Sequence, residues 1–159
     1  MKFRRMLTAG VVALGALATG APIAQASPVG PCADLRSFTF DFRTGGDDLR
    51  GNTEVIPFFV STTGDIELQH IWGPFANNST NPRTVGLNNP NWTVSSCAGQ
   101  GVKFRVVSHN DPFQSDDNWN MDAVTMYGYS GTGGYSYLLS VPNAFHRFTG
   151  SDQWWTRLG

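Results

Sequence analysis

The chain has 159 residues, with 11 basic and 12 acidic side chains and a formal net charge of −1 when histidine is neutral. Proteins that bind nucleic acid need a basic surface, so this balance argues against a nucleic acid partner. The length suits a single domain with one hydrophobic core.

Residues 1–26 have the pattern of a secretory signal peptide. Three basic residues precede an apolar run, and Ala24-Gln25-Ala26 fits a small-residue cleavage site. The run is too short and too rich in glycine for a membrane anchor, so we expect no transmembrane segment. Cleavage after Ala26 would leave 133 residues (159 − 26) with 8 basic and 12 acidic side chains, a net charge of −4 (8 − 12). We therefore expect a mildly acidic, secreted protein.

The two cysteines, Cys32 and Cys97, both lie beyond the predicted cleavage site. An exported protein meets an oxidising compartment, and no other cysteine competes, so we expect one disulfide. Neither cysteine has a second ligand at zinc-binding spacing. The bond would close a long loop and stabilise the fold by roughly 4 kcal/mol in the chain-entropy model. Residues 27–35 are expected to be an N-terminal lead-in that is flexible until Cys32 fixes it.

Alternating and continuous apolar runs predict strands in the first half of the domain. In residues 37–43, Phe38, Phe40 and Phe42 share one face. A second strand is expected at 53–61, where Pro57 cannot donate to a ladder and indicates an edge strand or a bulge. A turn and a third strand at 66–70 would complete a hairpin.

The second half continues the same pattern after a long irregular stretch. Residues 73–91 are rich in Gly, Pro and Asn and are expected to form loops around at most one short strand. Further strands are expected at 101–109, 119–127, 135–141 and 145–149. Short strands with frequent turns and no helical period predict an all-β antiparallel sandwich or barrel, as one domain over residues 36–159.

Two acidic stretches, residues 44–52 and 116–122, lie where strands end or begin and form a candidate metal site. Calcium prefers six to eight oxygen ligands in a tolerant geometry, and glycines let backbone carbonyls turn toward an ion. The candidate calcium ligands are Asp47, Asp48, Asn52, Asp116, Asp117 and Asn118.

Other uses of these acidic residues remain open. Asp and Asn are also common turn formers. Asp48 could pair with Arg43 or Arg50 instead of a metal. We expect Asp122 to be a polar position on the solvent face of its strand.

The sequence gives little support for catalysis. Residues 128–132 resemble a nucleophile elbow, but the last position is Thr132 and no helix follows. His70, His109 and His146 are isolated, so we expect each to be a surface or satisfied histidine rather than a general base or zinc ligand.

Trp154 and Trp155 are adjacent and cannot both face inward on a strand, so one of them is expected to be exposed. An exposed tryptophan could stack on a sugar, enter a membrane interface, or cover a sheet edge. Both are therefore candidate ligand-facing aromatic residues.

Three motifs resemble a known family. They are residues 42–51, which contain Thr44-Gly45-Gly46-Asp47-Asp48, residues 117–122, and residues 145–150. Together they are similar to small secreted actinobacterial proteins with a PLAT/LH2-like β-sandwich, over about residues 36–150. The resemblance implies about eight strands in two sheets and a non-catalytic module that often binds calcium and meets lipid surfaces or protein partners. Thr53-Glu54 departs from the Gly-Asn-Asp common in such proteins and removes one plausible carboxylate.

These features predict a secreted, non-catalytic binding module that binds calcium and contacts a protein or a lipid surface. Two alternatives remain open: a secreted hydrolase with an unrecognised site, and a carbohydrate-binding module that uses Trp154 or Trp155.

Overall fold

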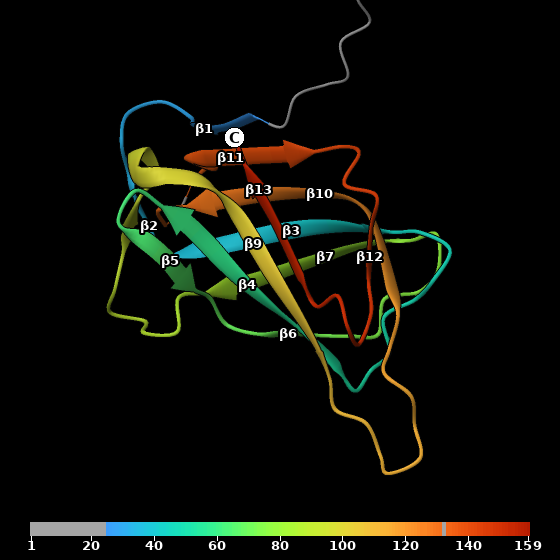
Figure 1. Ribbon diagram of the computed structural model, residues 1–159. Coiled ribbons are helices and arrows are strands. Elements are labelled where there is room, and N and C mark those ends of the chain that lie inside the picture. The colour runs from blue at the N-terminus through green and yellow to red at the C-terminus, as the bar shows by residue number, and fades with distance from the viewer. Residues whose placement is uncertain (1–24, 132) are drawn as a thin grey trace, which may run out of the picture.

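The computed structural model describes residues 25–131 and 133–159, which form two antiparallel sheets packed face to face (Figure 1). The prediction of an all-β antiparallel sandwich is confirmed. The elements are β1 (Gln25–Pro28), β2 (Asp34–Leu35), β3 (Ser37–Thr44), β4 (Thr53–Ser61), β5 (Gly64–Glu67), β6 (Ile71–Trp72), β7 (Thr80–Gly86), β8 (Val94–Ser95), the short 3-10 helix η1 (Ser96–Ala98), β9 (Gly99–Ser108), β10 (Trp119–Tyr129), β11 (Tyr137–Val141), β12 (His146–Phe148) and β13 (Trp154–Leu158).

One sheet has the strand order β1-β11-β10-β3-β7, with β12 also pairing with β10. The other has the order β13-β9-β4-β5, with β6 also pairing with β4. The short β2 and β8 form a separate pair. The strands outnumber the expected eight largely because β2, β6, β8 and β12 have only two or three residues each.

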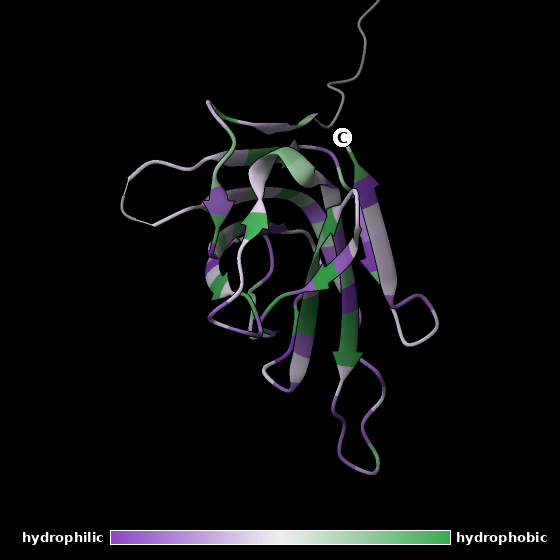
Figure 2. Ribbon diagram, turned by 90° about the vertical axis from the view of Figure 1, so that its left-hand side faces the viewer, coloured by the Kyte–Doolittle hydropathy of each residue, from purple (hydrophilic) through white to green (hydrophobic). Residues whose placement is uncertain are grey.

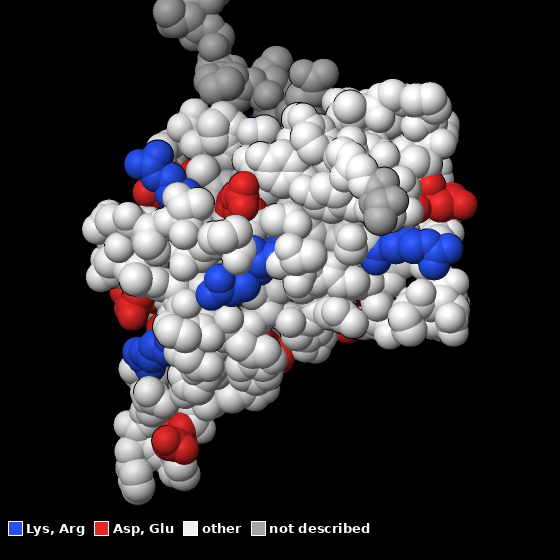
Figure 3. Space-filling view, turned by 180° about the vertical axis from the view of Figure 1, so that it is seen from behind, with Lys and Arg blue, Asp and Glu red and all other residues white. Residues whose placement is uncertain are grey.

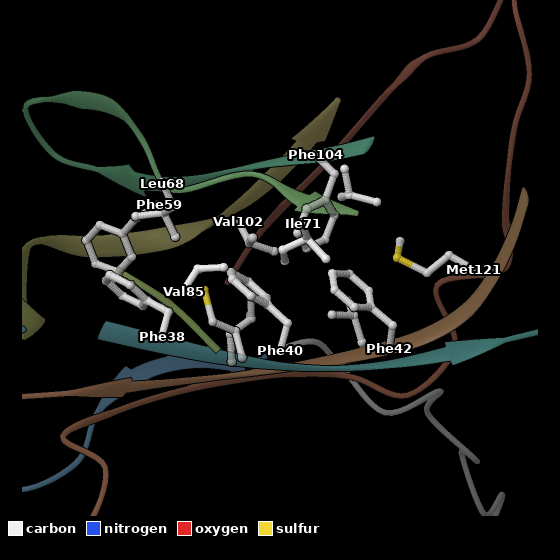
Figure 4. Close-up of a cluster of buried hydrophobic side chains, with 14 of the residues drawn as sticks. Phe38, Phe40, Phe42, Phe59, Leu68, Ile71, Val85, Val102, Phe104 and Met121 are labelled. Carbon is white, nitrogen blue, oxygen red and sulfur yellow. The ribbon is translucent and has the colours of Figure 1, made fainter. Parts of the chain in front are cut away.

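The core lies between the two sheets and is built from the alternating residues of the longest strands. Phe38, Phe40 and Phe42 of β3 are fully buried and point toward Phe59 and Phe104 of the opposite sheet (Figure 4). The ring of Phe42 lies 5.3 Å from that of Phe104, in an edge-on arrangement that aromatic pairs favour. Burying side chains of this size contributes roughly 1.5–3 kcal/mol each. The period-two pattern of the sequence is therefore what fixes which face of each strand is inside.

Pro57 corrects one strand prediction. β4 is not an edge strand, because it pairs with β9 on one side and with β5 and β6 on the other. It does carry a bulge-like shift of register with β9, between Val60 and Ser61 and not at Pro57. Pro57 lies where β5 has ended and β6 has not begun, and its carbonyl accepts the backbone N–H of Leu68. The missing donor therefore falls at a gap in the neighbouring strand, where it costs no ladder hydrogen bond.

The N-terminal segment is more ordered than expected. The predicted signal peptide lies outside the described residues except for Gln25 and Ala26, which begin β1. Ser27 and Pro28 pair with Leu138 and Tyr137 of β11, so the prediction of a flexible lead-in is wrong for these residues. The reason is that β1 covers the otherwise unpaired edge of β11.

The Cys32–Cys97 disulfide is present, with the two Cα atoms 5.3 Å apart. It ties the segment after β1 to η1 and closes a sequence separation of 65 residues. Cys32 lies just before β2 and Cys97 just after β8, so the bond reinforces this small strand pair.

Seen from behind, the molecule presents scattered Lys, Arg, Asp and Glu side chains with no continuous basic area on that face (Figure 3). Thr39 of β3 and Thr84 of β7 are hydrogen-bonded through their hydroxyl groups, whose oxygens lie 2.8 Å apart. Across the described ranges no helix is long and apolar enough to cross a membrane.

Candidate functional site

The two acidic stretches meet at one end of the sandwich. The first is the turn after β3, and the second is the end of the loop between β9 and β10, residues 109–118, which we call the 109–118 loop. This loop projects beyond the ends of the strands (Figures 1 and 2). The backbone N–H of Asn120 donates to the carbonyl of Asp47 at 3.2 Å, which joins the two stretches directly.

Asp117 is the main brace between them. Its carboxylate is buried and accepts the backbone N–H of Arg50 at 2.7 Å, and it also pairs with the Arg50 Nε at 3.2 Å. Its own N–H donates to the Ser108 hydroxyl at 3.0 Å. Arg50 Nη1 in turn donates to the carbonyl of Ser115 at 3.0 Å. Arg50 therefore pairs with Asp117, and not with Asp48 as one sequence alternative allowed.

Asn52 supports the loop from its other side. Its Nδ2 donates to the carbonyl of His109 and to Oε1 of Gln114, both at 3.0 Å. Its carbonyl accepts the N–H of His109 at 3.0 Å. The residue proposed as a metal ligand thus donates from its side chain to the loop, which leaves its amide oxygen as the only free ligand atom of that group.

Among the remaining candidate ligands, Asp47 and Asp116 have different hydrogen-bond partners. Asp47 accepts from Arg147 Nη2 at 2.8 Å, and Asp116 accepts from Asn110 Nδ2 at 2.8 Å. Asp48 is exposed and Asn118 is half-buried.

These contacts do not form a calcium cage as they stand. Asp117 and Asp47 are each neutralised by an arginine, and no group of three or more His, Cys, Asp or Glu side chains in residues 25–131 and 133–159 is arranged to hold a metal. Calcium would need several of these oxygens to turn toward one point. Calcium binding therefore stays a prediction of the sequence.

The tip of the 109–118 loop presents an aromatic side chain to solvent. Gln114 donates its N–H to the carbonyl of Asp111 at 3.0 Å, which closes a tight turn around Phe113. Phe113 is fully exposed. The turn, together with the contacts of Asp117 and Asn52, holds the loop that carries Phe113 in a defined position.

A second exposed aromatic residue lies at the base of the same loop. Trp72 of β6 is 47% exposed, and its ring lies 5.1 Å from the imidazole of His109. His109 Nε2 lies 2.9 Å from Oε1 of the buried Glu54, whose other oxygen lies 2.9 Å from His70 Nδ1. Glu54 thus anchors both the loop and the segment that leads into β6.

The Glu54 cluster shifts two pKa values. Burial alone would raise the pKa of Glu54, but hydrogen bonds with His109 and His70 outweigh it and hold the pKa below its ordinary value. Burial alone would lower the pKa of His70, but its hydrogen bonds with Glu67 and Glu54 raise it above the ordinary value. The cluster therefore favours a charged carboxylate beside a charged imidazole.

Of the two adjacent tryptophans, one is exposed and one packs on the core, as the sequence predicts. Trp155 packs on the core, with its ring stacked 5.6 Å from that of Phe104. Trp154 is 45% exposed on the edge strand β13, and its ring is covered by the ammonium of Lys103 at 4.6 Å and the guanidinium of Arg105 at 5.4 Å. These cation–π contacts cover the outer face of the sheet.

Sequence reasoning missed Phe113 as a functional candidate. The available signal was a phenylalanine directly after Asp111-Pro112, in a polar loop where the alternating pattern of β9 has already ended. An apolar residue in such a position has no strand face to pack against.

Comparison with solved structures finds a similar fold in a lipoxygenase. A crystal structure of Delta413-417:GS LOX matches with a TM-score of 0.52 and 11% identity, over 78% of this chain and 16% of that chain. The anaerobic structure of the same variant in complex with arachidonate matches with the same TM-score, identity and coverage. No family model and no curated protein matches the chain.

The match covers a small part of the lipoxygenase, so it concerns one domain of that enzyme and not its whole architecture. At this identity the likeness establishes the fold alone. Together with the two antiparallel sheets, it identifies the fold as a PLAT/LH2-like β-sandwich.

Proposed function

We propose that the protein is a non-catalytic binding module that docks on a lipid surface through the 109–118 loop. The observation that supports this most directly is the fully exposed Phe113 at the tip of a loop held by Asp117 and Asn52. Ordering the loop before contact lowers the entropy that docking would otherwise cost. The PLAT/LH2-like fold favours the same function, because one of the similar structures is a lipoxygenase bound to the lipid arachidonate.

The side chains at this end suit a membrane interface. Phe113 can enter the boundary between headgroups and acyl chains, while Trp72 offers an indole ring, which prefers that depth. Transfer of one phenylalanine side chain from water contributes roughly 1.5–3 kcal/mol. A single residue of this kind gives weak, reversible attachment rather than permanent anchoring.

The charges near the tip indicate which lipid is preferred. Asp111, Asp116 and Asp48 are exposed at this end and would be repelled by an anionic membrane. We therefore propose a zwitterionic surface such as phosphatidylcholine. The Cys32–Cys97 disulfide supports export of the protein to an oxidising compartment, where it would meet an outer membrane surface or lipid particles.

Vesicle co-sedimentation tests the proposal. Phosphatidylcholine vesicles should retain the protein, and Phe113→Ala should weaken binding about tenfold, because roughly 1.4 kcal/mol or more of transfer free energy is lost. Trp92→Ala is the matched control, since Trp92 is an exposed aromatic residue in the loop between β7 and β8. That loop lies away from the 109–118 loop in Figure 1. If the two variants bind equally, or if the unmodified protein does not bind, the lipid proposal fails and a protein partner takes its place.

The absence of catalysis is tested separately. A hydrolase screen on the purified protein should find no turnover. Turnover that a single substitution such as His109→Ala abolishes would instead support the secreted-hydrolase alternative.

A further inference from the structure

A small hollow lies beside the acidic turn and is separate from the 109–118 loop. It has a volume of about 320 Å³, is open to solvent, and is lined by Asn120, Asp122, Phe145, His146 and Arg147. This volume is at the lower end of the range for small-molecule sites, roughly 300–1,000 Å³. The lining mixes a carboxylate, a guanidinium, an amide, an imidazole and an aromatic ring.

The fold brings these residues together through an irregular part of β10. Asn120 pairs with Arg147 of β12, and the register between β10 and β3 shifts between Met121 and Ala123. The shift leaves Asp122 outside the ladder with β3, and its carbonyl instead accepts the N–H of Ala144 at 2.8 Å. Bulges of this kind redirect side chains toward a site.

The acidic turn holds the two charged groups of the hollow in place. A methyl group on Gly45 would lie 2.5 Å from Asp122 Oδ1, so only glycine lets this carboxylate lie where it does. Arg147 is held by Asp47 at 2.8 Å. Asp122 and Arg147 both line the hollow, so a ligand there can contact both charged side chains.

Two polar atoms of the lining are buried without a hydrogen-bond partner among the described residues. They are Asn120 Oδ1 and His146 Nε2, the latter 3.8 Å from Asp152 Oδ2 and thus too far for a hydrogen bond. Buried polar atoms are nearly always paired, and an exception needs an explanation such as a ligand. Asn120 and His146, the residues that carry these atoms, both line the hollow.

Phe145 adds a third observation. Its φ is 42°, in the left-handed region that phenylalanine rarely adopts, and its ring is 72% exposed. Backbone strain of this kind persists where it positions a side chain for a function. Here it places an apolar ring at the rim of a polar hollow.

The chemistry of the lining selects a neutral, hydroxyl-rich ligand. Asp122 disfavours an anion, and the positive charge of Arg147 in the same lining disfavours a cation. A hydroxyl group can donate to Asp122 while it accepts from Arg147 or Asn120. The exposed ring of Phe145 offers an apolar face to the C–H groups of a sugar ring.

We propose that this hollow binds one neutral pyranose unit, with Asp122, Arg147 and Asn120 contacting its hydroxyl groups and Phe145 stacking on its ring. The site is distinct from the lipid-facing loop and does not depend on it. It also differs from a sugar platform on Trp154, whose ring is already covered by Lys103 and Arg105.

Saturation-transfer NMR tests the proposal with the methyl pyranosides of glucose, galactose and mannose as probes. At least one of the three should bind. In amide spectra of the protein recorded with that sugar, chemical-shift changes should be confined to residues 120–122 and 145–147. Asp122→Asn and Phe145→Ala should each weaken binding roughly tenfold or more, because each removes a charge-assisted hydrogen bond or the stacking face. Phe113→Ala and Trp154→Ala should leave binding unchanged.

A glycine variant separates the side chain of Phe145 from its backbone conformation. Phe145→Gly should melt at the same temperature as the unmodified protein or higher, because glycine is relaxed at this φ, and should still lose binding. The proposal is overturned if no pyranoside binds, if binding survives both Asp122→Asn and Phe145→Ala, if Trp154→Ala abolishes it, or if glucuronate or glycine binds more tightly than every neutral sugar.

Discussion

At the scale of single residues, Tyr137 gives the clearest prediction about stability. Its ring is fully buried against Phe59, and its hydroxyl has no hydrogen-bond partner among the described residues. Burial raises the pKa of Tyr137 to about 12, which reflects the same lack of polar surroundings. An unpaired buried hydroxyl costs roughly 1–3 kcal/mol. Tyr137→Phe should therefore raise the free energy of unfolding by about 1 kcal/mol in a denaturant titration. A loss of stability would show that the hydroxyl is paired in solution.

His70 gives the pH dependence. Its two ring nitrogens lie 2.9 Å from Glu54 and 3.2 Å from Glu67, and only the doubly protonated ring can donate to both carboxylates. Because the pKa of His70 is raised in the folded state, its contribution to stability is fully present below the unfolded value of about 6.5 and is lost as the pH rises through the folded value.

Glu54 sets the acidic limit of the same cluster. Its pKa is lowered on folding, so its contribution is present above the ordinary value of about 4.5 and is lost as the pH falls through the folded pKa. The cluster should therefore stabilise the fold most between about pH 4.5 and 6.5. In unfolding curves measured across pH, the free energy of unfolding of the unmodified protein should fall above this window. The His70→Gln variant should show a smaller fall over the same pH range. Parallel pH profiles for the two proteins would rule the cluster out as the cause.

At the scale of elements, the acidic turn and the 109–118 loop are predicted to act as one braced unit. Asp117→Asn keeps the shape of the side chain but removes the charge that pairs with Arg50. Hydrogen bonds to charged groups contribute roughly 1.5–3 kcal/mol, and the partly exposed Arg50 places this one toward the lower end. We expect a loss of about 1–2 kcal/mol in unfolding free energy. Hydrogen exchange should speed up for amides in the 109–118 loop and remain slow in β9 and β4. Uniformly faster exchange would contradict a local brace.

Calcium is a separate prediction on the same elements. To bind, the ion would have to displace Arg147 from Asp47 or Arg50 from Asp117. An ion that binds only the folded state stabilises it by about 2.7 kcal/mol at a hundredfold excess over its dissociation constant. Millimolar calcium should then raise the melting temperature more than magnesium does, and Asp47→Asn combined with Asp117→Asn should remove the effect. Identical melting curves in calcium and chelator would mean that the acidic side chains serve only as braces.

Most of the elements could be predicted from the sequence, and particular residues show why. The alternation of Phe38, Phe40 and Phe42 is local information, so β3 and its buried face were predictable. β1, β6 and β13 were harder, because short edge strands form through pairing with a distant partner and not through their own pattern. Pro57 was misread for the same reason, since the gap between β5 and β6 is a feature of the sheet.

At the scale of the whole molecule, the site was predictable only in part. The sequence placed two acidic stretches at strand ends, and the fold does bring them together. The sequence did not indicate that Arg50 would pair with Asp117 or that Arg147 would pair with Asp47. The partners are 67 and 100 residues apart in the sequence. The turn that carries the candidate metal ligands also supports two neighbouring surfaces, the 109–118 loop and the hollow beside Phe145.

On the whole molecule, the braced 109–118 loop is proposed to enter a lipid surface with its tip first. Paramagnetic relaxation of backbone amides, measured on phosphatidylcholine bicelles that contain a lipid with a nitroxide on its acyl chain, tests this without altering the protein. The amides of Asp111, Phe113 and Gln114 should broaden most, the Trp72 indole less, and the amides of β1 and of Trp92 should remain sharp. Broadening that is strongest at β1, at Trp92 or across the outer face of β13, or no broadening at all, would contradict the proposed mode of docking.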